Sequence, residues 1–150
     1  MERDLAPLYG KHGFSIAAWS PLAWGLLSGK YNSGTIPAGS RFDTEKATFG
    51  SAIESLSSAE GQAKLERVRR LAVVADKLGC SVAALSLAWA ASNEDVSTVI
   101  LGARNEEQLR ENLGALGVMD RLREAGVREE IELALGNKPT PWPDHGRALS

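Results

Sequence analysis

The sequence predicts an α/β fold with a parallel sheet that the chain does not complete by itself. Two apolar segments with the length of buried strands, at 14–19 and 96–101, alternate with segments of helical periodicity. Two strands are too few for a stable sheet core. The chain has 150 residues, whereas a complete (β/α)8 barrel needs roughly 250 residues. We therefore expect either part of a larger barrel or a chain that must associate.

The predicted elements follow one another along the chain. Residues 2–12 are expected to form a short helix that ends at Gly13. Phe14 to Trp19 is almost entirely apolar, which is typical of a parallel strand buried on both faces. Residues 20–50 are rich in Gly, Ser and Pro and predict a long loop, whose apolar start PLAWGLL is packed. Further helices are expected at 59–78, 82–93, 106–116 and 125–135, with Ser81 and Asn105 as caps, a buried strand at 96–101 and a coil from 136 to 150.

Composition and charge exclude several classes of protein. Apolar residues make up 43% and charged residues 24%, which is typical of a soluble globular protein. A net charge of −2 and a pI near 5.7 argue against a nucleic-acid-binding or polybasic membrane surface. No apolar run approaches the roughly 20 residues that span a bilayer, and the first residues, MERDLAPLYG, are too polar for a signal peptide. The single cysteine excludes an internal disulfide, so the cytoplasm is the expected location.

The segment WSPLAWGLLSGKY, residues 19–31, is the first candidate for a binding site. The carboxyl end of a strand that opens into a Gly-rich loop is where barrels bind their ligands. Gly25 and Gly29 allow close backbone approach, Ser20 offers a hydroxyl group and Lys30 offers a cation. The alternative, which local spacing alone favours, is a packed turn with a solvated lysine.

The segment VILGARNEEQLREN, residues 99–112, is the second candidate. Free backbone N–H groups at the helix start after Asn105, together with the helix dipole, form an anion site. Arg104 lies where its guanidinium can bind a phosphate through two hydrogen bonds. The alternative is a capped surface helix with ordinary polar residues. The side chains that share one helix face and could hydrogen-bond an adenine edge are Gln108, Glu111 and Asn112.

Isolated residues elsewhere give weaker signals. Arg41, in the long loop, could cover a bound anion from above, although a solvated arginine is the more frequent case. His12 and His145 have no partner at metal-ligand spacing, so no metal site is expected. Cys80 lies between two predicted helices without a second thiol or a nearby histidine, and we expect it to be a small core residue.

Three strings of the sequence together resemble the aldo-keto reductases, most closely the β subunits of Shaker-type voltage-gated potassium channels. They are WSPLAWGLLSGKY, VSTVILGARNEEQLRENLGAL and LALGNKP, and the resemblance extends over about residues 4–138. It implies that the chain is the C-terminal part of a (β/α)8 TIM barrel. Residues 1–138 would be the C-terminal portion of an NADP-dependent oxidoreductase domain, and residues 139–150 a C-terminal tail.

The resemblance also implies which residues bind NADP(H). Arg104 stands where channel subunits tend to have serine and other family members have arginine, and it favours NADP over NAD because it can pair with the 2′-phosphate. Trp24 replaces a small residue or cysteine of the channel subunits, and Ala38 or Gly39 replaces a family tyrosine near Ser40. The matching positions are Trp19, Ser20, Pro21, Leu22, Ala23 and Trp24 near the nicotinamide and pyrophosphate, Lys30 at a phosphate, Arg41 in the closing loop, and Gly102, Arg104, Gln108, Glu111 and Asn112 at the 2′-phosphate and adenine.

The family's catalytic tetrad of Asp, Tyr, Lys and His lies on earlier barrel strands, so the resemblance implies no catalytic residue in this chain. Two functions stay open for the parent protein. One is a regulatory subunit, homotetrameric in full length, that binds a voltage-gated potassium channel α subunit at the cytosolic face of the plasma membrane without inserting into it. The other is a soluble NADPH-dependent carbonyl reductase. The string LGNKP favours the first and Arg104 slightly favours the second. A truncated product without an autonomous role is a third alternative.

Overall fold

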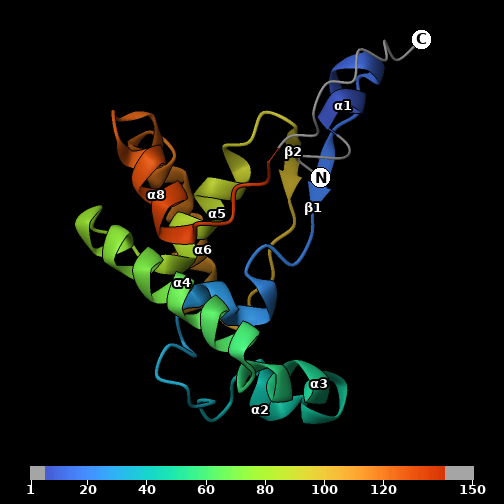
Figure 1. The fold of residues 1–150 in the computed structure, drawn as a ribbon, viewed down its shortest axis with the longest axis vertical. Helices are drawn as coiled ribbons and strands as arrows, with labels where there is room; N and C mark the ends of the chain where they lie inside the picture. Colours follow the sequence, from blue (N-terminus) through green and yellow to red (C-terminus); the bar gives the residue numbers. More distant parts are fainter. Residues whose placement is uncertain (1–5, 141–150) are drawn as a thin grey trace.

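The computed structural model describes residues 6–140, and the side chains from residue 8 onwards. Helices and short strands alternate along the chain, and helices form most of the structure (Figure 1). The elements in order are α1 (Ala6–His12), β1 (Ile16–Ala18), the 3-10 helix η1 (Ala23–Ser28), α2 (Arg41–Thr44), α3 (Lys46–Leu56), α4 (Ala59–Lys77), α5 (Val82–Ala91), β2 (Val96–Val99), α6 (Glu106–Leu113), α7 (Ala115–Val118), the 3-10 helix η2 (Arg121–Arg123) and α8 (Val127–Leu135).

The two strands pair in parallel, as the sequence predicts. Ile16 lies opposite Val96 and Ala18 opposite Val99, with an irregularity in the register after Ile16. Figure 1 shows the pair beside the helices rather than between them. The expected burial on both faces is wrong, because Ala17 and the middle of β2 are exposed, as is the flanking Trp19 at 74%. A parallel strand is buried only when neighbouring strands and helices cover it, and within residues 6–140 each strand has one neighbour.

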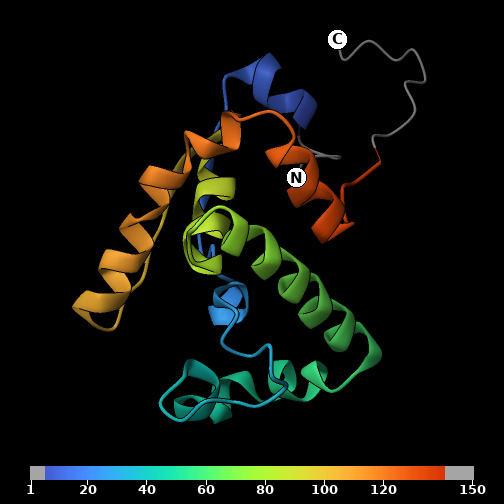
Figure 2. The same cartoon turned by 90° about the vertical axis from the view of Figure 1, so that its left-hand side faces the viewer.

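The main core lies between helices. α4 packs against α8, and α5 packs against α7 and against β2. Figure 2 shows α4 and α6 diverging on either side of α5, which is buried over most of its length, as its apolar sequence predicts. We call this the helical core, and its buried residues are Leu71, Val74, Ala75, Ala84, Leu85, Leu87, Ala88, Ala115, Val118, Leu122, Ile131 and Ala134. Burial of these side chains, worth about 1.5–3 kcal/mol for each large one, stabilises the helices in place of a sheet core.

Local signals set the helix ends. The side chain of Ser81 accepts a hydrogen bond from the Ala84 N–H at 3.1 Å, and Asn105 caps α6 in the same way. Both caps were predicted from sequence. The helix expected at 106–116 divides at Gly114 into α6 and α7, and η2 was not predicted. The predicted start of the first helix and most of the expected coil lie outside the described residues, whereas 136–140 has no helix or strand.

The predicted loop at 20–50 is partly wrong, because it contains η1, α2 and the beginning of α3. The α3 sequence, KATFGSAIESL, includes Gly50 and Thr48, which are poor helix formers. Packing compensates, since Phe49, Ile53 and Leu56 of α3 lie against a second apolar cluster. We call it the loop cluster, and its residues are Tyr31, Phe42 and Leu65, surrounded by Leu26, Ile36, Phe49, Ala52, Ile53 and Leu56. The apolar start of this segment is packed as expected, with Leu22 and Leu27 against the helical core.

Gly61 makes the sharp connection between α3 and α4 possible. A Cβ atom at this position would lie 2.0 Å from the Ser55 carbonyl oxygen and 2.6 Å from the Leu56 Cα. These are backbone atoms, so no side-chain rotation could relieve the clash. The two helices therefore approach each other closely, and α2 and α3 are held at one end of α4 (Figure 1).

Among the described residues, no single helix is both long enough and apolar enough to cross a membrane. Helices α4 and α5 meet such a test of length and composition only as a pair bent by 93°. The apolar side chains of α5 lie in the helical core, which accounts for its composition.

Candidate functional site

The turn after β1 has an unusual backbone. Ser20, Ala23 and Trp24 have positive φ angles of 50°, 47° and 57°, and Gly25 follows at 97°. A left-handed conformation at a residue with a side chain costs of order 1–3 kcal/mol. Hydrogen bonds from the Ala23 N–H to the Ser20 carbonyl, 2.8 Å, and from the Gly25 N–H to the Leu22 carbonyl, 2.9 Å, hold the turn. Strained backbone of this kind gathers at ligand sites, so the turn supports the first sequence candidate.

Gly25 brings Lys30 over this turn. A Cβ atom at Gly25 would lie 3.2 Å from the Lys30 Cε and 3.3 Å from its Nζ. The missing side chain therefore leaves the space that the ammonium group uses. The Tyr31 hydroxyl lies 3.6 Å from the same point and is buried without a hydrogen-bond partner. The Gly25 carbonyl accepts a hydrogen bond from the Ser28 hydroxyl at 2.7 Å, which fixes the geometry further.

The junction between β2 and α6 forms the second part of the site. The Arg104 N–H donates to the Gln108 side-chain oxygen at 2.9 Å. The Asn112 amide, one turn further along, is buried and donates to the Gly102 carbonyl at 3.4 Å. Glu111 is exposed on the same helix. The structure thus gathers Gly102, Arg104, Gln108 and Asn112 at one helix start, where free N–H groups and the helix dipole favour an anion.

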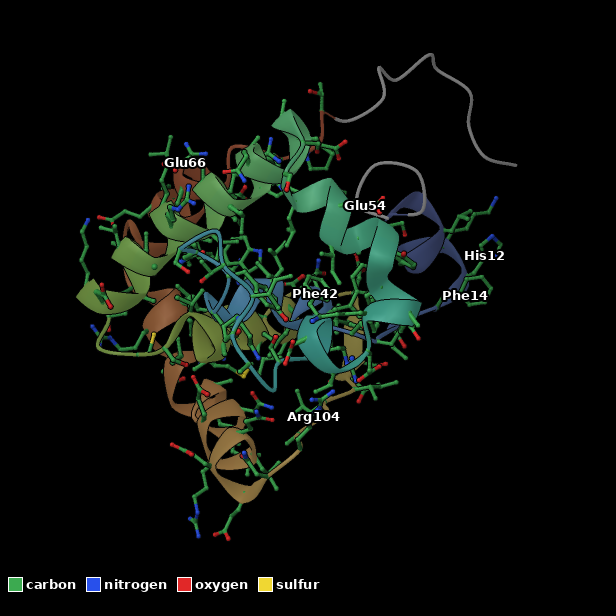
Figure 3. The ribbon with its side chains drawn as sticks, turned by 90° about the horizontal axis from the view of Figure 1, so that it is seen from below. His12, Phe14, Phe42, Glu54, Glu66 and Arg104 are labelled. Carbon is green, nitrogen blue, oxygen red and sulfur yellow. The ribbon has the colours of Figure 1, made fainter. Side chains whose placement is uncertain are left out.

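The Arg104 side chain connects this junction with the loop around α2. Its Nη2 lies 2.6 Å from Glu45 Oε1, and its Nη1 donates to the Gly39 carbonyl at 3.1 Å. Both terminal nitrogens also lie 3.2 Å from the Thr44 hydroxyl oxygen. Figure 3 shows Arg104 close to α2, the helix that carries Phe42. Segments that are about 60 residues apart in sequence therefore meet at one guanidinium group.

Arg41 belongs to the same arrangement. Its Nε lies 3.5 Å from Glu45 Oε1, the oxygen atom that Arg104 also contacts. Its guanidinium carbon lies 5.9 Å from the centre of the Phe49 ring, within range of a cation–π interaction. The Trp24 ring, from the strained turn, lies 5.7 Å from the same Phe49 ring. Trp24, Phe49, Arg41, Glu45 and Arg104 thus form a continuous chain of contacts through all three sequence candidates.

Asp43 closes the loop that carries Arg41. Its Oδ2 accepts a hydrogen bond from the Gly39 N–H at 2.9 Å, and its Oδ1 lies 3.1 Å from the Lys46 ammonium. The Gly39 hydrogen bond and the Lys46 charge lower the pKa of the Asp43 carboxyl below its ordinary value of 3.8. A lowered pKa means that this contact is fully present above pH 3.8 and is lost as the pH falls through the lowered value.

The remaining predicted site residues lie in different surroundings. Trp19 projects into solvent, Leu22 packs against the helical core, and Pro21 is half-buried. Ser40 is buried, and its hydroxyl has no hydrogen-bond partner. Cys80 packs at the edge of the helical core, as expected, and burial raises the pKa of its thiol above 9.0. Within residues 6–140, no three His, Cys, Asp or Glu side chains are grouped to hold a metal ion.

Sequence reasoning missed Glu45, Thr44 and Phe49. The spacing of Arg41 and Glu45, at i and i+4, is that of a helical ion pair, but a segment interpreted as loop gave no reason to use it. The contact between Glu45 and Arg104 joins two distant segments, so no local pattern predicts it.

Comparison with known proteins places the chain in a family. The model of the aldo/keto reductase family matches residues 1–127. A protein of Arabidopsis thaliana, named as a voltage-gated potassium channel subunit beta, is 40% identical over 143 residues, which are 93% of this chain and 40% of that protein. A similarly named protein of Schizosaccharomyces pombe is 44% identical over 121 residues, which are 81% of this chain and 34% of that protein.

A solved structure supports the fold. The glycerol dehydrogenase of Gluconobacter oxydans superposes with a TM-score of 0.60 at 23% identity, over 93% of this chain and 40% of that one. Such low identity bears on the fold alone. The chain spans 40% or less of the length of these proteins. With the strand–helix order and the parallel pair, these matches show that the chain belongs to the aldo/keto reductase family and forms part of its (β/α)8 barrel.

Proposed function

We propose that this chain is the NADP(H)-binding, C-terminal part of an aldo-keto reductase-like β subunit of a voltage-gated potassium channel. The observation that carries the nucleotide site is the convergence of Arg41 and Arg104 on one carboxylate oxygen. Two guanidinium groups that meet at one carboxylate oxygen form a site suited to phosphate, because carboxylate and phosphate oxygens both accept charge-assisted hydrogen bonds from arginine. The division into a domain at 1–138 and a tail at 139–150 stays part of this proposal.

The described residues fit a nucleotide with several phosphates. The strained turn from Ser20 to Gly25 offers close backbone approach, and Lys30 places an ammonium group over it. The buried Ser40 hydroxyl, without a protein partner, lies beside Arg41. A buried polar group without a partner is uncommon in proteins and is consistent with a ligand that completes its hydrogen bonding.

Each half of the nucleotide has its own residues in this proposal. Arg104 pairs with the adenosine 2′-phosphate, which NADP carries and NAD lacks. The residues from Trp19 to Trp24 lie along the nicotinamide and pyrophosphate, with Lys30 and Arg41 at phosphates. Gly102, Gln108, Glu111 and Asn112 hold the adenosine end. When bound, NADPH supplies a hydride, whereas the residues of this chain bind and orient the nucleotide.

Two functions compete for the whole protein. The names of the relatives from Arabidopsis thaliana and Schizosaccharomyces pombe favour a channel subunit, with a channel α subunit as partner and the cytosolic face of the plasma membrane as its location. Arg104 favours a carbonyl reductase, because serine is usual there in the channel subunits. Co-purification of the full-length protein with the cytoplasmic domain of a channel supports the first, and carbonyl reduction without channel binding supports the second.

Lys30→Ala tests the nucleotide site. Hydrogen bonds to charged groups contribute about 1.5–3 kcal/mol, so this variant of the full-length protein should bind NADPH and NADH both about 10- to 150-fold more weakly. Fluorescence titration measures the two dissociation constants. Lys64→Ala, which removes a lysine of α4 that pairs with Glu60, is the matched control and should bind like the wild type. Unchanged binding by the Lys30 variant would refute the proposed phosphate contact.

A further inference from the structure

The backbone of Glu45 is fixed from both sides. Its N–H donates to the Arg41 carbonyl at 2.9 Å, which closes α2. Its carbonyl accepts hydrogen bonds from the Thr48 and Phe49 N–H groups at 3.0 and 3.1 Å, which begin α3. The ring of Phe49 then packs in the loop cluster. The Glu45 carboxylate is therefore presented from a defined position rather than from a free loop.

A single oxygen of this carboxylate contacts both Arg41 and Arg104. Oε1 lies 2.6 Å from Arg104 Nη2 and 3.5 Å from Arg41 Nε. The side chains of Glu45, Arg41 and Arg104 are 39%, 45% and 44% exposed, so water reaches all three. Ion pairs with this exposure contribute little to stability, because solvent screens them. Another anion can therefore displace the carboxylate without disrupting the fold.

Thr44 and Gly39 bind Arg104 differently. They offer neutral oxygen atoms at 3.2 and 3.1 Å, which hold the guanidinium in place whether or not Glu45 is paired with it. Thr44 in turn donates to the Ser40 carbonyl at 3.1 Å, so its hydroxyl is itself positioned. Loss of the carboxylate contact thus leaves Arg104 oriented, with part of its donor capacity open to a new anion.

We propose that the Glu45 carboxylate competes with the ligand phosphate for Arg104. In the free protein its carboxylate takes the place of the ligand anion, and phosphate binding requires its displacement. This inference rests on the proposed nucleotide site and adds to it a residue that lowers affinity for the 2′-phosphate. A glutamate that only stabilised the loop would have no such effect on ligand binding.

Glu45→Gln of the full-length protein tests the inference by removing the charge and keeping the side-chain length. Isothermal titration with adenosine 2′,5′-bisphosphate should show binding tighter by about 2- to 5-fold, because the competing ion pair is lost. Binding of adenosine 5′-monophosphate, which lacks the 2′-phosphate, should change less, so the preference for the bisphosphate should rise. Glu54→Gln, at an exposed glutamate of α3 (Figure 3), makes the same charge change away from Arg104 and should bind like the wild type.

Two outcomes overturn the inference. Unchanged bisphosphate binding means that Glu45 does not compete, and weaker binding means that it positions Arg104 for the ligand. If circular dichroism shows that Glu45→Gln does not fold, Glu45→Asp supplies the same test. Its shorter side chain withdraws the carboxylate from the two arginines, so it should also tighten binding.

The proposed function can fail separately. If the wild type binds the bisphosphate and the monophosphate equally, and Arg104→Ala changes neither, the 2′-phosphate site itself is refuted. If the wild type prefers the bisphosphate, Arg104→Ala removes that preference and Glu45→Gln has no effect, only the role of Glu45 is wrong.

Discussion

Replacement of Phe42 by alanine should release the segment that carries Arg41 and Glu45. Phe42 is 2% exposed in the loop cluster, and its ring stacks on Tyr31 with 4.8 Å between ring centres. It also contacts the Phe49 ring at 5.7 Å. Deletion of a buried phenylalanine ring costs about 3–5 kcal/mol, through lost transfer free energy and the cavity that remains. The loop cluster is separate from the helical core, so we expect this cost to be felt mainly by α2 and α3.

Hydrogen exchange followed by mass spectrometry measures this effect in the full-length protein. Amides at 40–56 should exchange about 100- to 1,000-fold faster in Phe42→Ala, which corresponds to about 3–4 kcal/mol of lost local stability. Amides of α5, in the helical core, should exchange at the wild-type rate. Phe14→Ala removes an exposed ring of the same size and should change neither, since exposed substitutions usually alter stability by less than about 0.5 kcal/mol. Unchanged exchange at 40–56, or a uniform increase along the chain, would refute the separation of the two clusters.

Of three further predictions, two concern the 150-residue chain by itself and the last concerns the full-length protein. It should aggregate or form a molten state, because large apolar side chains such as Trp19, Ile100 and Leu116 are exposed; a monodisperse monomer with a sharp cooperative thermal transition would contradict this. It should not reduce 4-nitrobenzaldehyde with NADPH, because the family resemblance implies that the tetrad that protonates the substrate lies outside these 150 residues, and measurable turnover would contradict that assignment. In the full-length protein, Cys80 should react with iodoacetamide more slowly at pH 8 than the same thiol in urea, because burial in the folded state raises its pKa above 9.0 and keeps it neutral below that pH; equal rates would contradict the burial.

The helices at 59–77, 82–91 and 106–113 could be predicted because each has a local signal. Apolar residues recur at helical spacing in α4, and Ser81 and Asn105 precede the first turns of their helices. The parallel pairing followed from the alternation of strands and helices. In each case the residues that determine the element lie within or beside it, so sequence alone is informative.

Burial of the strands and the helical nature of α3 could not be predicted, because both depend on distant residues. The apolar sequence of β1 indicates the surroundings of a complete barrel, whereas within residues 6–140 only β2 pairs with it. In α3, Gly50 and Thr48 disfavour a helix, and contacts with Tyr31 and Leu65 of the loop cluster outweigh them.

The candidate site divides in the same way. The cap at Asn105 and the polar face of α6 are local, and the structure brings Arg104, Gln108 and Asn112 together as the sequence analysis expected. The approach of Glu45 to Arg104 depends on how two segments meet in space, and so it became visible only in the structure. The NADP(H)-binding roles of these residues stay predictions.

The nucleotide preference of Arg104→Ala tests the central claim most directly. In the full-length protein, loss of the guanidinium should weaken NADPH binding by about 10- to 150-fold, the equivalent of a charge-assisted hydrogen bond of roughly 1.5–3 kcal/mol. NADH lacks the 2′-phosphate, so its dissociation constant should change much less. Arg110→Ala, at an exposed arginine of α6 that pairs with Glu106, is the matched control and should keep the wild-type preference. Fluorescence titration with both nucleotides should therefore show a strongly reduced NADPH-to-NADH preference in Arg104→Ala alone; an unchanged preference would show that Arg104 is only a solvated residue at a helix start.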